Sequence, residues 1–180
     1  MPIFPEAGRL AELRRLGISE PLVRLAFGER LHPAFDPCFV GPPRRVYRRP
    51  EDQVSVPDGP PLVPLWSFGD GVQGVWEVEG GLEFIDYDVE APERYQVVAR
   101  TEQGFLAWMF MTLHEDLFDE EDEFETLPGA AERVGFRHYA DWLAAYEAAN
   151  VGSVDEWDAF QERFVAGIDA LKTSRDRKRR

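Results

Sequence analysis

Residues 62–117 constrain the fold of this chain more than any other part of its sequence. Within residues 72–78, apolar or small residues alternate with polar or outward-facing positions, and this period of two is typical of a half-buried strand. Gly80-Gly81 follows as a two-residue loop of the kind that closes a hairpin. Because residues 82–88 then form a second strand, the pattern predicts a β-hairpin.

A third strand and an apolar helix follow this hairpin. A strand over residues 94–100 places Tyr95, Val97 and Ala99 on one face. Thr101 is expected to cap a helix that covers residues 101–118. One side of that helix carries large apolar side chains, namely Phe105, Leu106, Met109, Phe110, Leu113 and Leu117.

The N-terminal part of the chain has a helical pattern over residues 6–30. Gly17 ends a first helix, Ser19 is placed to cap a second short one, and Gly28 ends that. Residues 32–64 contain nine prolines, which excludes helix and favours extended segments. The basic run 44–49 is therefore expected to be an edge strand that its charges protect.

The C-terminal part has the pattern of a helical hairpin over residues 132–171. Its second helix opens at Ser153 with a capping-box sequence that includes Glu156. An apolar stripe along this helix is expected to pack the hairpin against the sheet, and it consists of Trp157, Phe160, Phe164, Ile168 and Leu171.

These patterns together predict one α+β domain over residues 1–171. Its antiparallel or mixed sheet of about four to six strands occupies residues 38–100. The N-terminal helices precede the sheet, and the helix and the helical hairpin follow it. The basic segment 172–180 is expected to be a disordered tail.

The single cysteine and the lack of long apolar segments indicate the cellular compartment of the protein. Cys38 cannot form a disulfide within the chain, which points to a reducing compartment. It is interpreted as a small buried hydrophobe rather than as a nucleophile. Since neither a signal-peptide pattern nor a stretch of transmembrane length is seen, we expect a cytoplasmic protein.

The net charge of −14 is unevenly distributed. Residues 172–180 carry +5, so the rest of the chain carries −19. Such a body repels nucleic acid and attracts basic partners, although solubility alone also explains an acidic surface. Clusters of basic residues occur only at residues 44–49 and in the tail, so nucleic acid is not the expected partner.

The densest acidic segment is residues 115–125, in which eight of eleven residues are acids. Like charges at this density destabilise a regular helix, so an exposed loop or a frayed helix end is expected. The segment is either a solvated loop or part of a surface that contacts a basic partner. The residues of the second interpretation are Glu115, Asp116, Asp119, Glu120, Glu121, Asp122 and Glu123.

A metal site is the alternative that involves specific chemistry. His114 lies beside two carboxylates near a helix end, and Asp86 and Asp88 point to the same face of a strand. Together these three residues would suit a metal-dependent hydrolase. In the other interpretation, His114 bonds a local carboxylate and both aspartates face solvent. Since no phosphate-binding loop or nucleophile motif occurs, we assign no cofactor and no catalytic residue.

The middle of the chain resembles the SUKH superfamily over about residues 10–117. The likeness rests on a proline and hydrophobic residues before the Gly69-Asp70 turn, on the strands that follow, and on a polar-capped helix that begins with the pair Phe105-Leu106. The resemblance implies an α+β fold and a non-enzymatic role. Many bacterial members are immunity proteins that bind and neutralise a secreted toxin, often a nuclease.

The leading hypothesis is therefore an acidic cytoplasmic module that binds a basic protein, in the manner of a toxin-immunity protein. A metal-dependent hydrolase and a regulatory scaffold protein are the alternatives. The sequence does not separate an immunity role from a regulatory one, and it names neither the partner nor the oligomeric state.

Overall fold

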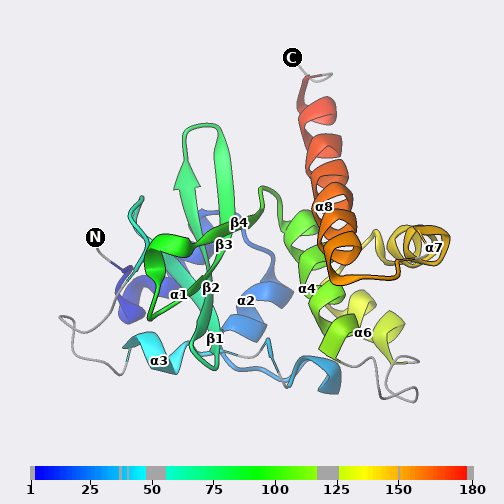
Figure 1. Cartoon of the computed structure of the whole chain (residues 1–180). Helices are drawn as coiled ribbons and strands as arrows, with labels where there is room; N and C mark the ends of the chain where they lie inside the picture. Colours follow the sequence, from blue (N-terminus) through cyan, green and yellow to red (C-terminus); the bar gives the residue numbers. More distant parts are fainter. Residues whose placement is uncertain are drawn as a thin grey trace. The chain divides into compact units, whose positions relative to one another are not determined.

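The protein has an α+β fold, as predicted, with helices before and after a four-stranded sheet of order β1-β2-β3-β4 (Figure 1). The structure is a computed structural model that describes residues 3–36, 38–39, 41–47, 56–116, 126–149 and 151–177. The chain divides into two compact units, Met1–Val97 and Val98–Arg180. Each unit is described by itself, and the predicted single domain over residues 1–171 stays a prediction.

Two short helices open the first unit, α1 (Arg9–Arg15) and α2 (Glu20–Ala26). Gly17 and Gly28 follow them with φ of 77° and 87°, a left-handed conformation that glycine adopts without strain, so both predicted helix ends are confirmed. Ser19 holds the N-cap position of α2 as expected, but its side chain makes no capping hydrogen bond.

Arg9, on α1, is fully buried and joins three segments of the first unit. Its guanidinium donates to the carbonyl oxygens of Ala26 at 2.8 Å, Pro64 at 3.1 Å and Leu65 at 3.2 Å. The guanidinium also lies 4.2 Å from the ring centroid of Phe27. Burial lowers the pKa of Arg9, although Tyr47 and Glu6 oppose this effect. The sequence pattern gave no sign of this buried cation.

The segment between the helices and the sheet differs from the prediction. It contains a 3-10 helix (Pro33–Phe35) and the short helix α3 (Arg44–Tyr47), where no helix and an edge strand were expected. A proline at or before the first turn favours a helix start because its missing N–H has no intrahelical partner there. The predicted sheet over residues 38–100 therefore begins only at β1 (Val63–Phe68).

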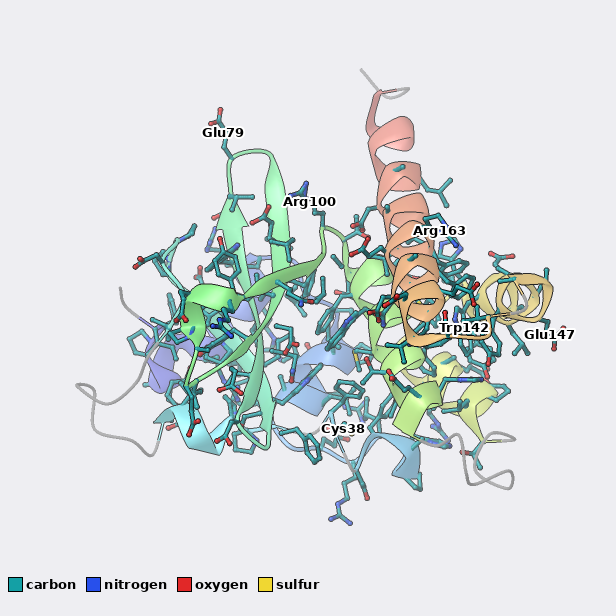
Figure 2. All side chains as sticks on the ribbon, viewed as in Figure 1. Cys38, Glu79, Arg100, Trp142, Glu147 and Arg163 are labelled. Carbon is teal, nitrogen blue, oxygen red and sulfur yellow. The ribbon has the colours of Figure 1, made fainter. Side chains whose placement is uncertain are left out.

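The predicted hairpin is confirmed as strands β2 (Gly71–Val78) and β3 (Gly81–Asp88). Val78 pairs with Gly81, so the two-residue loop is Glu79-Gly80, one residue earlier than expected. Gly80 has a φ of 98°, which a hairpin loop of this length requires. Glu79 projects from the tip of the hairpin (Figure 2).

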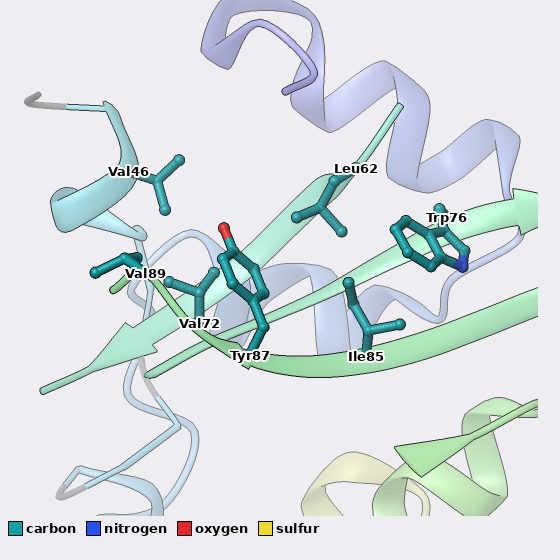
Figure 3. Packing of buried hydrophobic residues seen from close by; sticks show 7 residues of the cluster. All are labelled: Val46, Leu62, Val72, Trp76, Ile85, Tyr87 and Val89. Atoms are coloured by element: carbon teal, nitrogen blue, oxygen red, sulfur yellow. The ribbon is translucent and has the colours of Figure 1, made fainter. Parts of the chain in front are cut away.

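Strand β2 is buried on both faces, whereas its alternation predicted a half-buried strand. Val72 and Trp76 face one cluster, shown in Figure 3. On the other face, Gln73 and Val75 are only 7% and 0% exposed. The cluster of Figure 3 consists of Val46, Leu62, Val72, Trp76, Ile85, Tyr87 and Val89.

The last strand is shorter than predicted. Arg94, the first residue of the strand predicted over residues 94–100, belongs to a 3-10 helix (Pro92–Arg94) instead. Strand β4 covers Gln96–Ala99. Tyr95 packs edge-on against Trp76 at a centroid distance of 5.3 Å, and Ala99 is buried. Val97 is 39% exposed, so the three residues of the predicted common face are not equally covered.

The second unit is built around helix α4 (Glu102–Asp116). Thr101 caps it as predicted, because the Gly104 N–H donates to Thr101 Oγ1 at 3.0 Å. Asp169 accepts from Thr101 Oγ1 at 2.6 Å and from the Arg100 N–H at 2.7 Å. A Cβ at position 104 would meet the Asp169 carboxylate, so any larger residue there would require that carboxylate to shift from its hydrogen bonds with Thr101 and Arg100.

Helix α4 is buried more widely than the predicted one-sided stripe. Ala107 and Met111 lie outside that stripe and are as fully buried as Phe105 and Phe110. A helix that is apolar on nearly all sides forms the centre of a core rather than its edge. The last residue of the predicted stripe, Leu117, lies outside the described residues.

Three more helices complete the second unit: α6 (Leu127–Val134), α7 (Tyr139–Ala149) and α8 (Val154–Arg177). Helix α6 was not predicted; it begins with a proline in its first turn and ends at Gly135, where φ is 72°. The predicted helical pair is present as α7 and α8, which contact each other.

The start of α8 has the predicted cap. The Glu156 N–H donates to Ser153 Oγ at 3.3 Å, and the Gly152 N–H donates to Glu156 Oε2 at 2.9 Å. Within the predicted stripe, Phe160 and Ile168 are buried, but Leu171 is 50% exposed.

Residues 172–177 were expected to be disordered, and the structure shows that α8 continues to Arg177. Lys and Arg are good helix formers, and positive charge near a helix C-terminus is stabilised by the helix dipole. The remainder of the predicted tail, residues 178–180, lies outside the described residues.

Candidate functional site: an acidic surface on the second unit

The predicted acidic contact surface is only partly described. Glu115 is exposed in the last turn of α4. Asp116 ends that helix, and its side chain lies outside the described part of the structure. The same is true of the remaining predicted contact residues: Asp119, Glu120, Glu121, Asp122 and Glu123.

Helix α8 carries a second group of acids that sequence reasoning treated only as a helix start. Asp155, Asp158 and Glu162 are exposed and precede Arg163, the first basic residue of the helix. None of the three forms an ion pair with a described residue, whereas Glu156 accepts hydrogen bonds at the N-terminus of the helix. The signal was visible in the sequence, because residues 154–162 contain four acids and no base.

Several acids of the first unit are paired with arginines. Arg15 bridges Glu12 at 2.6 Å and Glu77 at 2.8 Å, and Arg14 pairs with Glu20 at 2.9 Å. Two further pairs are Arg24 with Glu29 and Arg30 with Asp36. Exposed acids outside these ion pairs occur in both units, and on α8 three of them, Asp155, Asp158 and Glu162, follow one another along one helix.

The net charge also differs between the two units. Residues 98–171 contain 17 acids and four bases, a net charge of −13, whereas residues 1–97 contain 16 acids and ten bases, a net charge of −6. Other exposed residues of the second unit include Glu147, which points outward from α7 (Figure 2). The second unit is thus the more acidic part of the protein up to residue 171.

Two of the proposed metal ligands, Asp86 and Asp88, each accept a hydrogen bond within the first unit. Asp86 accepts a hydrogen bond from Gln73 Nε2 at 2.5 Å, and exposed Asp88 accepts from the Glu90 N–H at 2.7 Å. Within the described ranges, no three His, Cys, Asp or Glu side chains gather as a metal ion requires. Asp86 and Asp88 belong to the first unit and His114 to the second, so each is described by its own contacts.

His114 lies instead in a cluster of aromatic rings and is 8% exposed. Its ring centroid is 4.6 Å from Tyr146, 5.3 Å from Trp142 and 5.9 Å from Trp157. Burial lowers the pKa of His114 because it disfavours the imidazolium. The alternative in which His114 bonds a local carboxylate stays a prediction.

The cysteine and the tryptophans belong to the packing of the protein. Cys38 is buried, as predicted. Trp66, Trp76 and Trp142 are almost fully buried. Trp108 and Trp157 are partly buried, and Trp108 stacks on Phe105 at a centroid distance of 5.7 Å.

Asp86 gives a prediction about pH. Burial is the main cause that raises its pKa, and Asp88 adds to it, while the Gln73 hydrogen bond opposes it. A raised folded-state pKa means that ionised Asp86 lowers stability as the pH rises above about 4. Gln73 Oε1 is buried without a hydrogen-bond partner among the described residues. Asn at position 86 is neutral and brings an N–H donor.

We therefore expect Asp86→Asn to raise the free energy of unfolding by about 1 kcal/mol at pH 7. The gain should shrink towards pH 4, where Asp86 is itself protonated. Urea unfolding at both pH values measures this, with Glu79→Gln, an exposed acid at the tip of the same hairpin, as the control. A loss of stability at pH 7 in the Asp86→Asn variant would contradict this account of the Gln73–Asp86 pair.

Comparison with protein-family models, curated proteins and solved structures finds no match to this chain. The comparisons therefore leave the SUKH resemblance as an expectation from the sequence.

Among the residues that the structure describes, no helix combines the length and apolarity that crossing a membrane requires.

Proposed function

We propose that this protein is a non-enzymatic acidic module that binds a basic protein partner, in the manner of a SUKH-type immunity protein that neutralises a toxin. The observation that carries the proposal is the set of exposed carboxylates on α8, Asp155, Asp158 and Glu162, which no described arginine or lysine neutralises. They lie in the part of the chain with a net charge of −13.

The chemistry of a nuclease toxin fits this surface. A nuclease is positively charged where it holds its substrate, and an acidic protein can occupy that surface in place of the nucleic acid. Opposite charges accelerate the encounter of the two proteins, and salt screens that attraction. We therefore propose that partner binding involves the exposed acids of α8, and that the acid-rich residues 115–123, which the sequence indicates, also take part.

Exposure of the α8 acids has a stability consequence that favours binding over a structural role. Exposed ion pairs contribute little to folding, and unpaired exposed acids contribute less. Asp155 lies in the first turn of α8, where the helix dipole favours an acid. Asp158 and Glu162 lie beyond that turn, and a basic partner would give these exposed acids a role. Solubility remains the competing explanation, and a regulatory scaffold would use the same surface on a different partner.

Affinity capture tests the proposal. The tagged protein is used to capture partners from its own cells at low and at high salt, and the partners are identified by mass. We expect a single basic protein that is retained at low salt and weakened at high salt. Absence of a protein partner at both salt concentrations would remove the support for a binding module, and substrate screening would then be the better course.

A further inference from the structure

One side of helix α8 carries acids near its start, small residues in its middle and a base at its end. The positions recur every three or four residues, so they lie along one side of the helix over a length of about 33 Å. In chain order they are Asp155, Ala159, Glu162, Ala166, Ala170, Thr173 and Arg177. Burial is described for the first five of them: Ala159 is half-buried, and the other four are exposed. We call this the outward side of α8.

The side of α8 that packs within the second unit is a different one. Phe160, Val165 and Ile168 are buried there, and α8 contacts both α4 and α7. Asp169 accepts its two hydrogen bonds from the start of α4, so the turns of α8 after Asp169 run beyond that helix (Figure 1). The outward side therefore continues along a part of α8 that extends past the helix on which it packs.

The two ends of α8 carry opposite charges. Asp155, Asp158 and Glu162 are exposed near its start, whereas positions 172–177 at its end contain three bases and one acid. A second copy of α8 laid parallel to the first would set acids against acids. A second copy laid antiparallel would set the acidic end of each helix against the basic end of the other. The helix is therefore complementary in charge to a second copy of itself in the antiparallel orientation.

The spacing along the outward side gives a register for such a pair. With a two-fold axis at Ala166, Asp155 of one copy lies level with Arg177 of the second copy, and the same contact recurs at the other end. Near the axis, Glu162 lies level with Ala170 of the second copy, so a longer side chain meets a small one. Alanine at the axis allows two helices to approach to about 8 Å.

We propose that the outward side of α8 docks a second copy of this chain in an antiparallel pair with two-fold symmetry. A single pair of helices is a small interface beside the roughly 1,200 Å² that stable complexes bury, so the dimer should form at about 10–100 µM protein. Salt should weaken it because the charges at both ends are screened. The inference does not rest on the proposed function, although a second copy and a basic partner would compete for Asp155 and Asp158.

Analytical ultracentrifugation of the purified protein at low and at high salt tests the pairing. One variant reverses the acids of α8, through Asp155→Lys, Asp158→Lys and Glu162→Lys. The other reverses the bases, through Lys172→Glu, Arg175→Glu and Arg177→Glu. Each variant alone should stay monomeric where the wild-type protein dimerises, and an equimolar mixture of the two should form a dimer again. The control is the same reversal of exposed acids in the first unit, through Asp58→Lys, Glu79→Lys and Glu90→Lys, and it should dimerise as the wild-type protein does.

Two cysteine variants test the orientation and leave the charges of α8 unchanged. Ala166→Cys places both thiols at the two-fold axis, so mild oxidation should link two copies through a disulfide. Ala170→Cys is the matched control, because its two thiols lie about 12 Å apart along the axis of an antiparallel pair, whereas a parallel pair would bring them together as well. Cys38 is buried and is common to both variants.

Three results would overturn the proposal. The first is a wild-type protein that stays monomeric at low salt and about 100 µM, the upper end of the expected range for so small an interface. The second is a mixture of the two reversed variants, each shown by circular dichroism to be folded, that forms no dimer. The third is equal cross-linking of Ala166→Cys and Ala170→Cys. The first and third results need neither of the reversed variants, so they decide the question even if those variants fail to fold.

Discussion

Replacement of Arg9 by methionine is expected to lower the free energy of unfolding by about 3–5 kcal/mol. Methionine fills similar space but leaves three buried carbonyl oxygens without their charged donor, those of Ala26, Pro64 and Leu65. The Ala26 carbonyl is at the end of α2, where a helix has acceptors without intrahelical partners. Chemical denaturation of the purified variant gives the value directly.

Arg14 offers a matched control on the same helix. Its side chain is 55% exposed and pairs with Glu20 at the surface, so Arg14→Met should change stability by less than about 1 kcal/mol. Arg9→Lys should fall between the two, because it keeps the charge but lacks the planar fork that reaches several acceptors. Equal effects of Arg9→Met and Arg14→Met would contradict the structural role of Arg9.

Neutralisation of the α8 acids is expected to slow association with the captured basic partner by about tenfold at low salt. The variant Asp155→Asn, Asp158→Asn, Glu162→Gln removes three exposed charges without changing side-chain size. Dissociation should change less, since long-range attraction acts mainly on the encounter. Surface plasmon resonance or stopped-flow measurements at several salt concentrations separate the two rates.

A second variant neutralises the predicted run from Asp119 to Glu123, and it should slow association in the same way. The control removes three exposed acids of the first unit, through Asp58→Asn, Glu79→Gln and Glu90→Gln. The control changes the net charge by three units, as the α8 variant does, but should leave the association rate closer to that of the wild-type protein. If all three variants associate equally fast, the contact surface lies elsewhere.

The sequence correctly predicted those elements that depend on a pattern within a few neighbouring residues. The hairpin of β2 and β3 follows from a period of two interrupted by glycines, and the caps at Thr101 and Ser153 follow from short polar motifs. Helices α3 and α6 were missed because each is short. For α3, the prolines of residues 32–64 were interpreted as helix breakers rather than as residues that can begin a helix.

Burial was predicted less well because it depends on contacts between distant segments. The carbonyl acceptors of Arg9 lie 17, 55 and 56 residues away along the chain, and nothing near Arg9 indicates them. Helix α4 is buried on more than one side, so the one-sided apolar stripe seen in the sequence predicted too little burial. For the candidate site, acid density indicated residues 115–125, whereas Asp155, Asp158 and Glu162 were overlooked because the apolar stripe of α8 dominated its interpretation.

The most direct test of the proposed function is a titration of the captured partner's own activity with the purified protein. If the partner is a nuclease, its cleavage of nucleic acid is followed as this protein is added at low salt. We expect the activity to be lost at one equivalent of the wild-type protein and to return at high salt. Full partner activity at a large excess of a well-folded wild-type protein would contradict the proposed neutralising role.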